Sequence, residues 1–447
     1  MKTLKKISIM NLPGKRIPEL IAILMMGYLL LFPAGGTSLQ AQDALTLDFC
    51  YRMAEQNFPL AGQLDLLSGS SKLKVQNLNK NWLPSINING QVSYQSDVTK
   101  VVIQLPAGLP PLDMPELSKD WYKATLDVGQ TIWDGNVTSY QKKLEEVNLQ
   151  VDQTNVKAEL YKLKEQVNQF YFSIILLNQN EELLLSSKRQ LEEKLQELNA
   201  GIAFGAVLQS VADALEAELI RIDQRITESR ADRSGLIRML SELISVELPE
   251  SVILVMPDPL LADYTFQNNR LENEVFDLQR GRLELLQSMV TTKWNPKFFA
   301  FGQAGIGRPG LNMLSDNFDP FYIVGIKLNW NPWNWNANKN EKKILGIQSD
   351  ILQTQQASFD KNLKIQSHRE LTEILKMLEV LKQDQEIIAL REKISQSASA
   401  QLDNGVITSS DYVTRLTEER QARLNFEIHK VQLVKAKLSY LYDQGRL

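Results

Sequence analysis

The residue types that most often carry catalytic or metal chemistry are rare in this chain. Its 447 residues include one cysteine, Cys50, and two histidines, His368 and His429, which lie far apart in the sequence. Zinc sites need clustered cysteines and histidines, and Cys–His or Ser–His–Asp catalysis needs a histidine beside its nucleophile. We therefore expect no metal, no other cofactor and no enzymatic activity.

One glycine-rich motif, Gly305-Ile306-Gly307-Arg308-Pro309-Gly310, fits the phosphate-binding pattern G-x-G-x-x-G. A nucleotide site needs a helix directly after the motif, whereas Pro309 and a loop rich in Asn and Asp follow here. The chain carries 49 Lys and Arg against 53 Asp and Glu, so no excess of positive charge is available to bind a phosphate backbone. We expect neither a nucleotide nor a nucleic acid as ligand.

The N-terminal segment has the pattern of a secretory signal. Basic residues precede an apolar run from Leu20 to Phe32, and small residues follow up to Ala41. The apolar run is shorter than the roughly 20 residues that a membrane span requires. The sequence predicts a signal peptide at residues 1–41, with an uncleaved anchor as the less favoured alternative.

Two long stretches without proline can form long helices. No proline lies between Glu116 and Leu248, or after Trp333. Each stretch contains a seam of apolar residues that recur at alternating steps of four and three; the members are Val156, Leu160, Leu163, Val167, Phe170, Ile174 and Leu177 in the first and Leu371, Ile374, Leu378 and Leu381 in the second. This heptad pattern is typical of helices that supercoil against neighbours. A helix from about Asn136 to Ala200 would be roughly 100 Å long, which no compact core could contain.

Four other segments alternate apolar and polar residues, the period of a strand with one apolar face. The predicted strands cover about 84–96, 121–133, 296–307 and 321–332. The third is the weakest, because Phe299 and Phe301 fall on the face that should be polar. Tryptophans flank the strands, and we expect them to lie at membrane interfaces; they are Trp82, Trp121, Trp133, Trp294, Trp330 and Trp333.

The chain also repeats itself. Trp82-Leu83-Pro84 recurs as Trp294-Asn295-Pro296, 212 residues later, and the strand that ends at Trp133 recurs 200 residues later. A third match pairs Asn199–Ile202 with Asp403–Val406 at a spacing of 204. We predict a first repeat at 42–247, a linker at 248–262 and a second repeat at 263–447, each built as helix, two strands, long helix, glycine turn and helix.

Strands with an apolar face, flanking tryptophans and a signal peptide together indicate an outer-membrane β-barrel, because lipid admits only helices or closed sheets. Four strands cannot close a barrel, so several chains must share one. Two chains would give eight strands around a filled interior, and three would give twelve around a watery one. The residues of the first strand that would face the barrel interior are polar, which favours three chains; they are Asn87, Asn89, Gln91 and Ser93. A soluble sheet packed on helices and a plain coiled-coil rod are the alternatives.

The segment Val128-Gly129-Gln130-Thr131-Ile132-Trp133-Asp134-Gly135 resembles the strand-to-helix motif of the TolC family of outer-membrane efflux and secretion channels. The resemblance covers about Leu45 to Tyr442. It implies a mainly α fold in which a homotrimer forms a 12-stranded β-barrel over a helical barrel, in the outer membrane of a Gram-negative bacterium with the helices in the periplasm. A periplasmic adaptor and an inner-membrane pump would dock at the closed helical end. A periplasmic adaptor or scaffold without a pore is the alternative.

The resemblance also assigns site residues. The family's adaptor-contacting tips match Gly201-Ile202 and Gly405-Val406, whose glycines we expect to end the long helices in left-handed conformations. Asp411 matches a carboxylate that narrows the periplasmic gate, Thr414 stands where the family has a second carboxylate, and Val207 is expected opposite Asp411. Asp411 can equally be an acidic residue at a helix start, and the two roles are compatible.

Overall fold

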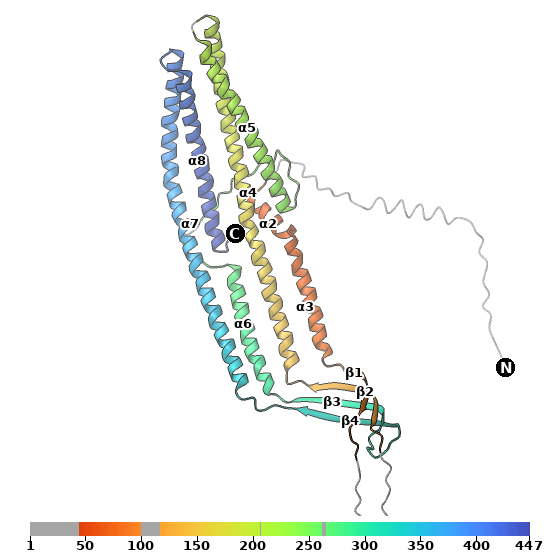
Figure 1. The fold of residues 1–447 in the computed structure, drawn as a ribbon. Coiled ribbons are helices and arrows are strands. Elements are labelled where there is room, and N and C mark those ends of the chain that lie inside the picture. Colours follow the sequence, from red (N-terminus) through yellow and green to blue (C-terminus); the bar gives the residue numbers. More distant parts are fainter. Residues whose placement is uncertain (1–43, 100–116, 206, 262–264) are drawn as a thin grey trace, which may run out of the picture. The chain divides into compact units, whose positions relative to one another are not determined.

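A computed structural model describes residues 44–99, 117–205, 207–261 and 265–447 of the chain (Figure 1). The predicted signal peptide at 1–41 lies outside these residues. All the described helices and strands belong to one compact unit, Leu45–Leu447.

Most of this unit is helical. The helices are α2 (Leu47–Asn57), α3 (Gln63–Lys80), α4 (Val137–Ala203), α5 (Gln209–Ile244), α6 (Leu271–Thr291), α7 (Ala337–Asp403) and α8 (Ser409–Asp443), with 3-10 turns at Pro59–Gly62 and Thr292–Trp294. Helices α4 and α7 are each 67 residues long. In Figure 1, α4 forms a hairpin with α5 and α7 forms one with α8, while α3 and α6 run along the parts of α4 and α7 nearer the strands. The prediction of two long helical stretches is confirmed.

The strands form one antiparallel sheet in the order β1-β2-β3-β4; they are β1 (Ser85–Tyr94), β2 (Asp120–Trp133), β3 (Lys297–Arg308) and β4 (Asp319–Asn329). Strands β2 and β3 come from different halves of the chain, so their pairing joins the two halves. The third strand forms despite its phenylalanines because Phe301 lies opposite Gly325 of β4, which leaves room for the ring. The four predicted strands are therefore present.

The two helical seams differ in burial. In α4, Val167 and Ile174 are fully buried in a core with α2 and α5. In α7, Ile374 is buried, but Leu378 of the same predicted seam is exposed. Further large apolar residues along α7 are exposed in the single chain; they are Ile344, Ile347, Ile351, Ile365, Leu375, Ile387, Leu390 and Ile394. One chain therefore does not bury the heptad pattern of α7.

The segment between the halves packs against the start of the unit. Leu254 pairs with Leu45 in an isolated parallel bridge, and the Tyr171 hydroxyl lies 2.7 Å from the carbonyl oxygens of both Leu45 and Val255. Cys50 is fully buried in the same core, and burial raises the pKa of its thiol to about 12. Cys50 is thus an unreactive core residue.

Helix positions define the repeat more sharply than sequence matching does. Helix α7 begins and ends 200 residues after α4, and α8 begins 200 residues after α5. The spacing of 204 that pairs Asn199–Ile202 with Asp403–Val406 is therefore wrong. Among the described residues, no helix is both long and apolar enough to cross a membrane.

Candidate functional site

The two hairpin turns form one end of the helical region (Figure 1). In the second turn, Gly405 has a φ of +68° between the end of α7 and the start of α8, and Val406 follows it on the surface. In the first turn, the residue with positive φ is Gly205, at +71°. Gly205 and Gly405 therefore make equivalent turns, as their left-handed conformations require.

The expected turn at Gly201-Ile202 is wrong, because both residues lie inside α4. A Cβ atom on Gly201 would lie 2.8 Å from Cγ2 of Val207, so the glycine allows the chain beyond the turn to approach the helix. The predicted turn was placed at Gly201, the first of two nearby glycines. A spacing of 200, carried down from the strand ends, would have selected Gly205.

Apolar side chains project from both turns. Phe204 is 89% exposed, and Leu208 and Val406 are also exposed. A groove of 830 Å³ lies between the turns; its lining includes Gly201, Val207, Leu208, Leu402 and Ile407. Phe204 and Leu208 were not predicted as turn residues, because they flank Gly205 rather than Gly201.

Asp411 starts α8 in a capping box with Thr408. The Asp411 amide donates to Oγ1 of Thr408 over 3.2 Å, and Oδ2 of Asp411 accepts from the Thr408 amide over 3.1 Å and from its hydroxyl over 2.6 Å. These bonds hold the pKa of Asp411 below its ordinary value, so the exposed carboxylate is charged at neutral pH. The helix-start interpretation of Asp411 is thus correct.

The neighbours of Asp411 differ from those expected. Thr414 is exposed, and its hydroxyl donates to the Ser410 carbonyl over 2.8 Å. Val211, not Val207, is the first-half equivalent of Asp411, because α5 and α8 begin 200 residues apart. The Ser409 hydroxyl donates to the Val211 carbonyl over 3.0 Å, which joins the starts of α5 and α8.

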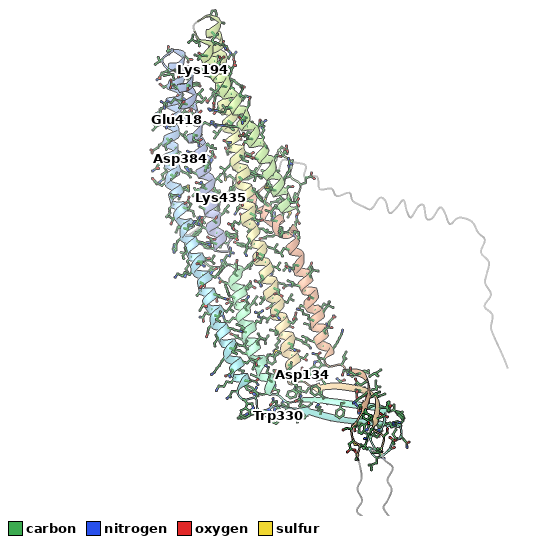
Figure 2. All side chains as sticks on the ribbon, in the orientation of Figure 1. Asp134, Lys194, Trp330, Asp384, Glu418 and Lys435 are labelled. Carbon is green, nitrogen blue, oxygen red and sulfur yellow. The ribbon has the colours of Figure 1, made fainter. Side chains whose placement is uncertain are left out.

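Lys194 links the two hairpins just behind the turns (Figure 2). Its side chain, 5% exposed, projects from α4 and places Nζ 2.6 Å from Asp403 of α7 and 2.7 Å from Glu197 of α4. Burial lowers the pKa of Lys194, but hydrogen bonds to the two carboxylates outweigh burial and leave the pKa raised. Lys194 therefore remains charged at neutral pH.

An apolar cluster and a polar cavity lie around this link. The cluster draws Leu191 and Leu198 from α4, Leu215 from α5 and Leu402 and Leu416 from α7 and α8. The cavity measures 260 Å³, and its lining includes charged groups of both hairpins. Close to the turns, the hairpins are therefore packed and ion-paired to each other.

The sheet has two faces of different chemistry. One face carries exposed apolar side chains, among them Ile86, Ile88 and Val92 of β1, Leu126, Val128 and Ile132 of β2, and Tyr322, Val324, Ile326 and Leu328 of β4. On the other face, Nε2 of Gln303 lies 2.5 Å from Oδ1 of Asp127, the Thr125 hydroxyl lies 3.0 Å from Oδ2, and Asn89 also bonds to Asp127. The sheet can thus separate an apolar environment from water.

The outer strands β1 and β4 each pair with only one strand among the described residues. An unpaired edge leaves backbone N–H and C=O groups without partners, which is unfavourable in lipid. Additional strands are needed to complete this sheet in a membrane.

The tryptophans mark the two ends of the sheet. Trp121 is near the start of β2, while Trp82, Trp133, Trp294, Trp330 and Trp333 are near the helices, where Figure 2 places Trp330 and Asp134. Trp330 and Trp333 are exposed, whereas Trp133 is half-buried 6.1 Å from the Phe298 ring. Trp335, which is not among the six predicted interface tryptophans, is the most exposed tryptophan of the described residues at 83%.

The strand-to-helix motif has a local structural role. Gln130 donates through Nε2 to the Trp82 carbonyl over 2.5 Å, which ties β2 to the turn before β1. Oδ2 of Asp134 accepts from the Thr138 amide over 2.7 Å at the start of α4. Gly135 has a φ of +72°, which a glycine adopts without strain.

The two motifs set aside in the sequence take structural roles. Gly305 and Gly307 lie in β3, which is followed by β4 and not by a helix. A Cβ on Gly305 would lie 2.4 Å from the Ala124 carbonyl oxygen, so the glycine serves the strand contact. His429 of α8 lies 2.6 Å from Asp384 of α7 and links the two helices. The described residues contain no cluster of three or more His, Cys, Asp or Glu side chains suited to a metal ion.

Comparison with solved structures identifies the fold. The outer membrane channel CmeC of Campylobacter jejuni matches with a TM-score of 0.62 and 12% identity, over 91% of this chain and 86% of its own. The outer membrane protein VceC of Vibrio cholerae matches with a TM-score of 0.64 and 10% identity, over 89% and 96%. The open state of the MtrE outer membrane channel of Neisseria gonorrhoeae matches with a TM-score of 0.62 and 13% identity, over 90% and 89%.

No protein-family model and no curated protein sequence matches the chain. The chain has the fold of these outer membrane channels over most of its length, so the single-chain fold implied by the TolC-family resemblance is confirmed.

Proposed function

We propose that this protein is the outer-membrane exit duct of a tripartite efflux pump or a type I secretion system in a Gram-negative bacterium. The observation that carries this proposal is the four-stranded sheet, which is apolar and exposed on one face, carries the hydrogen-bonded polar cluster of Asn89, Asp127 and Gln303 on the other, and is unpaired at both edges within the described residues. The fold shared with CmeC, VceC and MtrE supports it. A periplasmic scaffold without a pore gives the apolar face of the sheet no role.

The active form in this proposal is a homotrimer. Three copies of the sheet, with β4 of each chain paired to β1 of the next, form a 12-stranded barrel wide enough to hold water. The face with Asn89, Asp127 and Gln303 lines the interior, and the apolar face contacts lipid. The exposed apolar residues of α7 pack against the neighbouring chain in the helical part.

The partners are a periplasmic adaptor and an inner-membrane pump, which dock at the hairpin turns. Phe204, Leu208 and Val406 offer exposed apolar contacts there, beside the groove between the turns. Gly405→Val puts a branched side chain at a φ of +68°, where only glycine is unstrained. This variant should insert into the outer membrane normally but co-purify less adaptor; lost insertion would mean that the turn serves folding alone.

The chain performs no catalysis in this proposal and supplies a passive path. The pump provides the energy and selects the cargo, and the helical ends open like an iris. Because Lys194 and the apolar cluster join the hairpins within one chain, opening moves each chain's hairpin pair as one body against its neighbours.

The gate is proposed at Asp411 and Thr414, both exposed near the start of α8. Three symmetry-related carboxylates of Asp411 near the axis would narrow the opening and attract cations. Since the capping box lowers the pKa of Asp411, the carboxylates stay charged at neutral pH within each chain.

Planar-bilayer recording on the purified oligomer tests duct and gate together. The wild type should form small channels that are mostly closed and prefer cations. A soluble species without conductance would refute the proposed exit duct. Asp411→Ala removes size, charge and cap, so single-channel conductance should rise. Asp411→Asn keeps the size and an oxygen for the Thr408 amide but removes the charge, so it should lower cation preference with little change in conductance.

Thr414→Asp serves as the matched gain-of-charge variant, since Thr414 lies one helical turn from Asp411. It should raise cation preference. If none of these variants changes conductance or ion preference, Asp411 and Thr414 do not line the gate.

A further inference from the structure

The two strand-to-helix junctions of the chain adopt the same turn with different residues. In the first half, Gly135 and Asn136 have φ of +72° and +72° before α4 begins; in the second half, Trp335 and Asn336 have φ of +54° and +63° before α7 begins. Glycine and asparagine tolerate this left-handed region, whereas a bulky residue is strained there. Trp335 is therefore held in a strained conformation.

Packing within the chain does not offset that strain. Trp335 is 83% exposed and Trp333 is 69% exposed, and their rings meet edge to face with centroids 5.8 Å apart. By contrast, Gly135 is buried, with the position of a Cβ only 2.9 Å from Cβ of Asn295. The first junction is closed by the other half of the chain, and the second presents a pair of tryptophans to its surroundings.

Lysines lie close to the exposed pair in the sequence and around the neighbouring Trp294. Lys293 is paired with Glu341 over 2.6 Å, and Nζ of Lys342 lies 5.6 Å from the centroid of the Trp294 ring. Lys339 and Lys343, in the first two turns of α7, are exposed, and no ion pair to either is found within the described part of the chain. The patch thus combines an apolar surface with uncompensated positive charge.

We propose that Trp333, Trp335, Lys339 and Lys343 form a binding surface for anionic phospholipid headgroups. The inference rests on the proposed function, which puts this end of the sheet at the periplasmic surface of the membrane. Trp330 continues the exposed face of β4, so the two further tryptophans extend the lipid-contacting surface toward the helices. Indole rings favour the headgroup region, and each lysine near an anionic leaflet attracts the lipid phosphates.

The tryptophans and the lysines contribute differently to lipid binding. Insertion of Trp333 and Trp335 among headgroups depends little on lipid charge, and it supplies the contacts that hold the strained turn. Lys339 and Lys343 distinguish anionic from zwitterionic lipid, because only a net negative headgroup leaves its phosphate free to pair with them. The patch is therefore selective for phosphatidylglycerol over phosphatidylcholine.

The test uses the delipidated, full-length oligomer in detergent, titrated with dioleoylphosphatidylglycerol or dioleoylphosphatidylcholine, with bound lipids counted by native mass spectrometry. The wild type should bind phosphatidylglycerol more tightly. The double variant Lys339→Gln/Lys343→Gln should weaken phosphatidylglycerol binding by about fivefold for each lysine and leave phosphatidylcholine binding unchanged. Trp335→Gly should weaken the binding of both lipids.

Lys142→Gln/Lys143→Gln is the matched control, because these lysines occupy the first turns of α4 beside the closed junction. It should leave both affinities unchanged. Inorganic phosphate at concentrations that match the lipid should not compete; if it competes as well as the lipid does, the site binds free phosphate and the inference is overturned.

Two further outcomes would also overturn the inference. Equal affinities of the wild type for both lipids would remove headgroup recognition, while bilayer conductance would still support the exit duct. A loss of trimer in lipid-free detergent for Trp335→Gly would show that Trp335 contacts a second copy of this chain instead. Absence of conductance in every lipid is the different failure that would count against the proposed function itself.

Discussion

The two halves of the chain place their long helices 200 residues apart, yet they differ where those helices begin and end. At the sheet end, buried Gly135 of the first half corresponds to exposed Trp335 of the second; at the turn end, apolar Val211 corresponds to charged Asp411. Near the end of the last helix of each half, partly buried Leu243 corresponds to buried Asp443. The backbone repeats while the surface chemistry does not.

This difference teaches where a duplicated scaffold can specialise. Inside the seams, some positions stay apolar and buried in both halves, as Ile174 and Ile374 do, whereas others change from apolar to polar, as from Val167 to Ser367. Residues at helix ends meet solvent, lipid or partner proteins, so each half can acquire its own charge or aromatic groups there. The second half carries the proposed gate and the proposed lipid surface; the first half carries Phe204 and Leu208 at its turn.

The largest effect is expected from exchanging the residues of the two junctions. Gly135→Trp adds left-handed strain and a clash with Asn295, so it should lower the free energy of unfolding by about 2–6 kcal/mol. Trp335→Gly relieves strain but frees the unfolded chain, so it should change stability by less than about 1 kcal/mol in detergent. Thermal unfolding followed by circular dichroism measures both.

If Gly135→Trp fails to fold, Gly135→Ala provides the smaller perturbation, with the same strain and only the Cβ contact. Equal effects of the forward and reverse exchanges would contradict the assignment of one closed and one open junction.

A smaller effect is expected at Asp443. Burial, with a smaller contribution from the carboxylates of Glu370 and Glu165, raises the pKa of Asp443 to about 6, although Arg270 and Arg369 oppose the rise. The folded state thus holds the proton more tightly than the unfolded state, so the contribution of Asp443 to stability is complete below about pH 4 and is lost as the pH rises through about 6. Asp443→Asn should therefore stabilise the protein at pH 8 by about 1–3 kcal/mol.

The measurement for Asp443 is the melting temperature at pH 4 and pH 8. The wild type should lose stability relative to Asp443→Asn as the pH rises, and Glu386→Gln, at an exposed site on α7, should follow the wild type. Parallel pH profiles for the wild type and Asp443→Asn would refute the burial argument.

The smallest effect is expected at the hairpin turns. Gly205→Ala and Gly405→Ala place a Cβ in open space at a left-handed φ, so each should cost about 1 kcal/mol. Amide hydrogen exchange beside each turn should then speed up by about fivefold. Similar effects at the two glycines would support the equivalence of the turns at Gly205 and Gly405. A marked effect at only one of them would contradict it.

Local patterns in the sequence were sufficient for the elements of this fold. Proline-free heptads predicted α4 and α7, and the alternation in segments such as Ile86–Val92 predicted the strands and the chemistry of their faces. These patterns follow from the backbone geometry, which repeats with every helical turn or every second strand residue. Many positions along the chain therefore indicate the same element. The helix-start role of Asp411 was equally readable, since a capping box is confined to four consecutive residues.

Other features depended on residues that are distant in the chain. Gly201 and Gly205 look alike in their local sequence, and the structure places Gly201 inside α4, close to Val207, and gives Gly205 the positive φ of the turn. Lys194 sits on a helix like many other lysines, and only the position of Asp403 makes it an ion-paired link between hairpins.

What the sequence by itself determined is thus the set of long helices and strands, because apolar residues recur along it at the period of a helix or of a strand. What only the tertiary structure decided is the environment of single residues: the strain and exposure of Trp335, the burial of Asp443 and the ion pairing of Lys194. The physical reason is that φ, burial and charge pairing at one position are set by neighbours from other elements, and no local pattern records them.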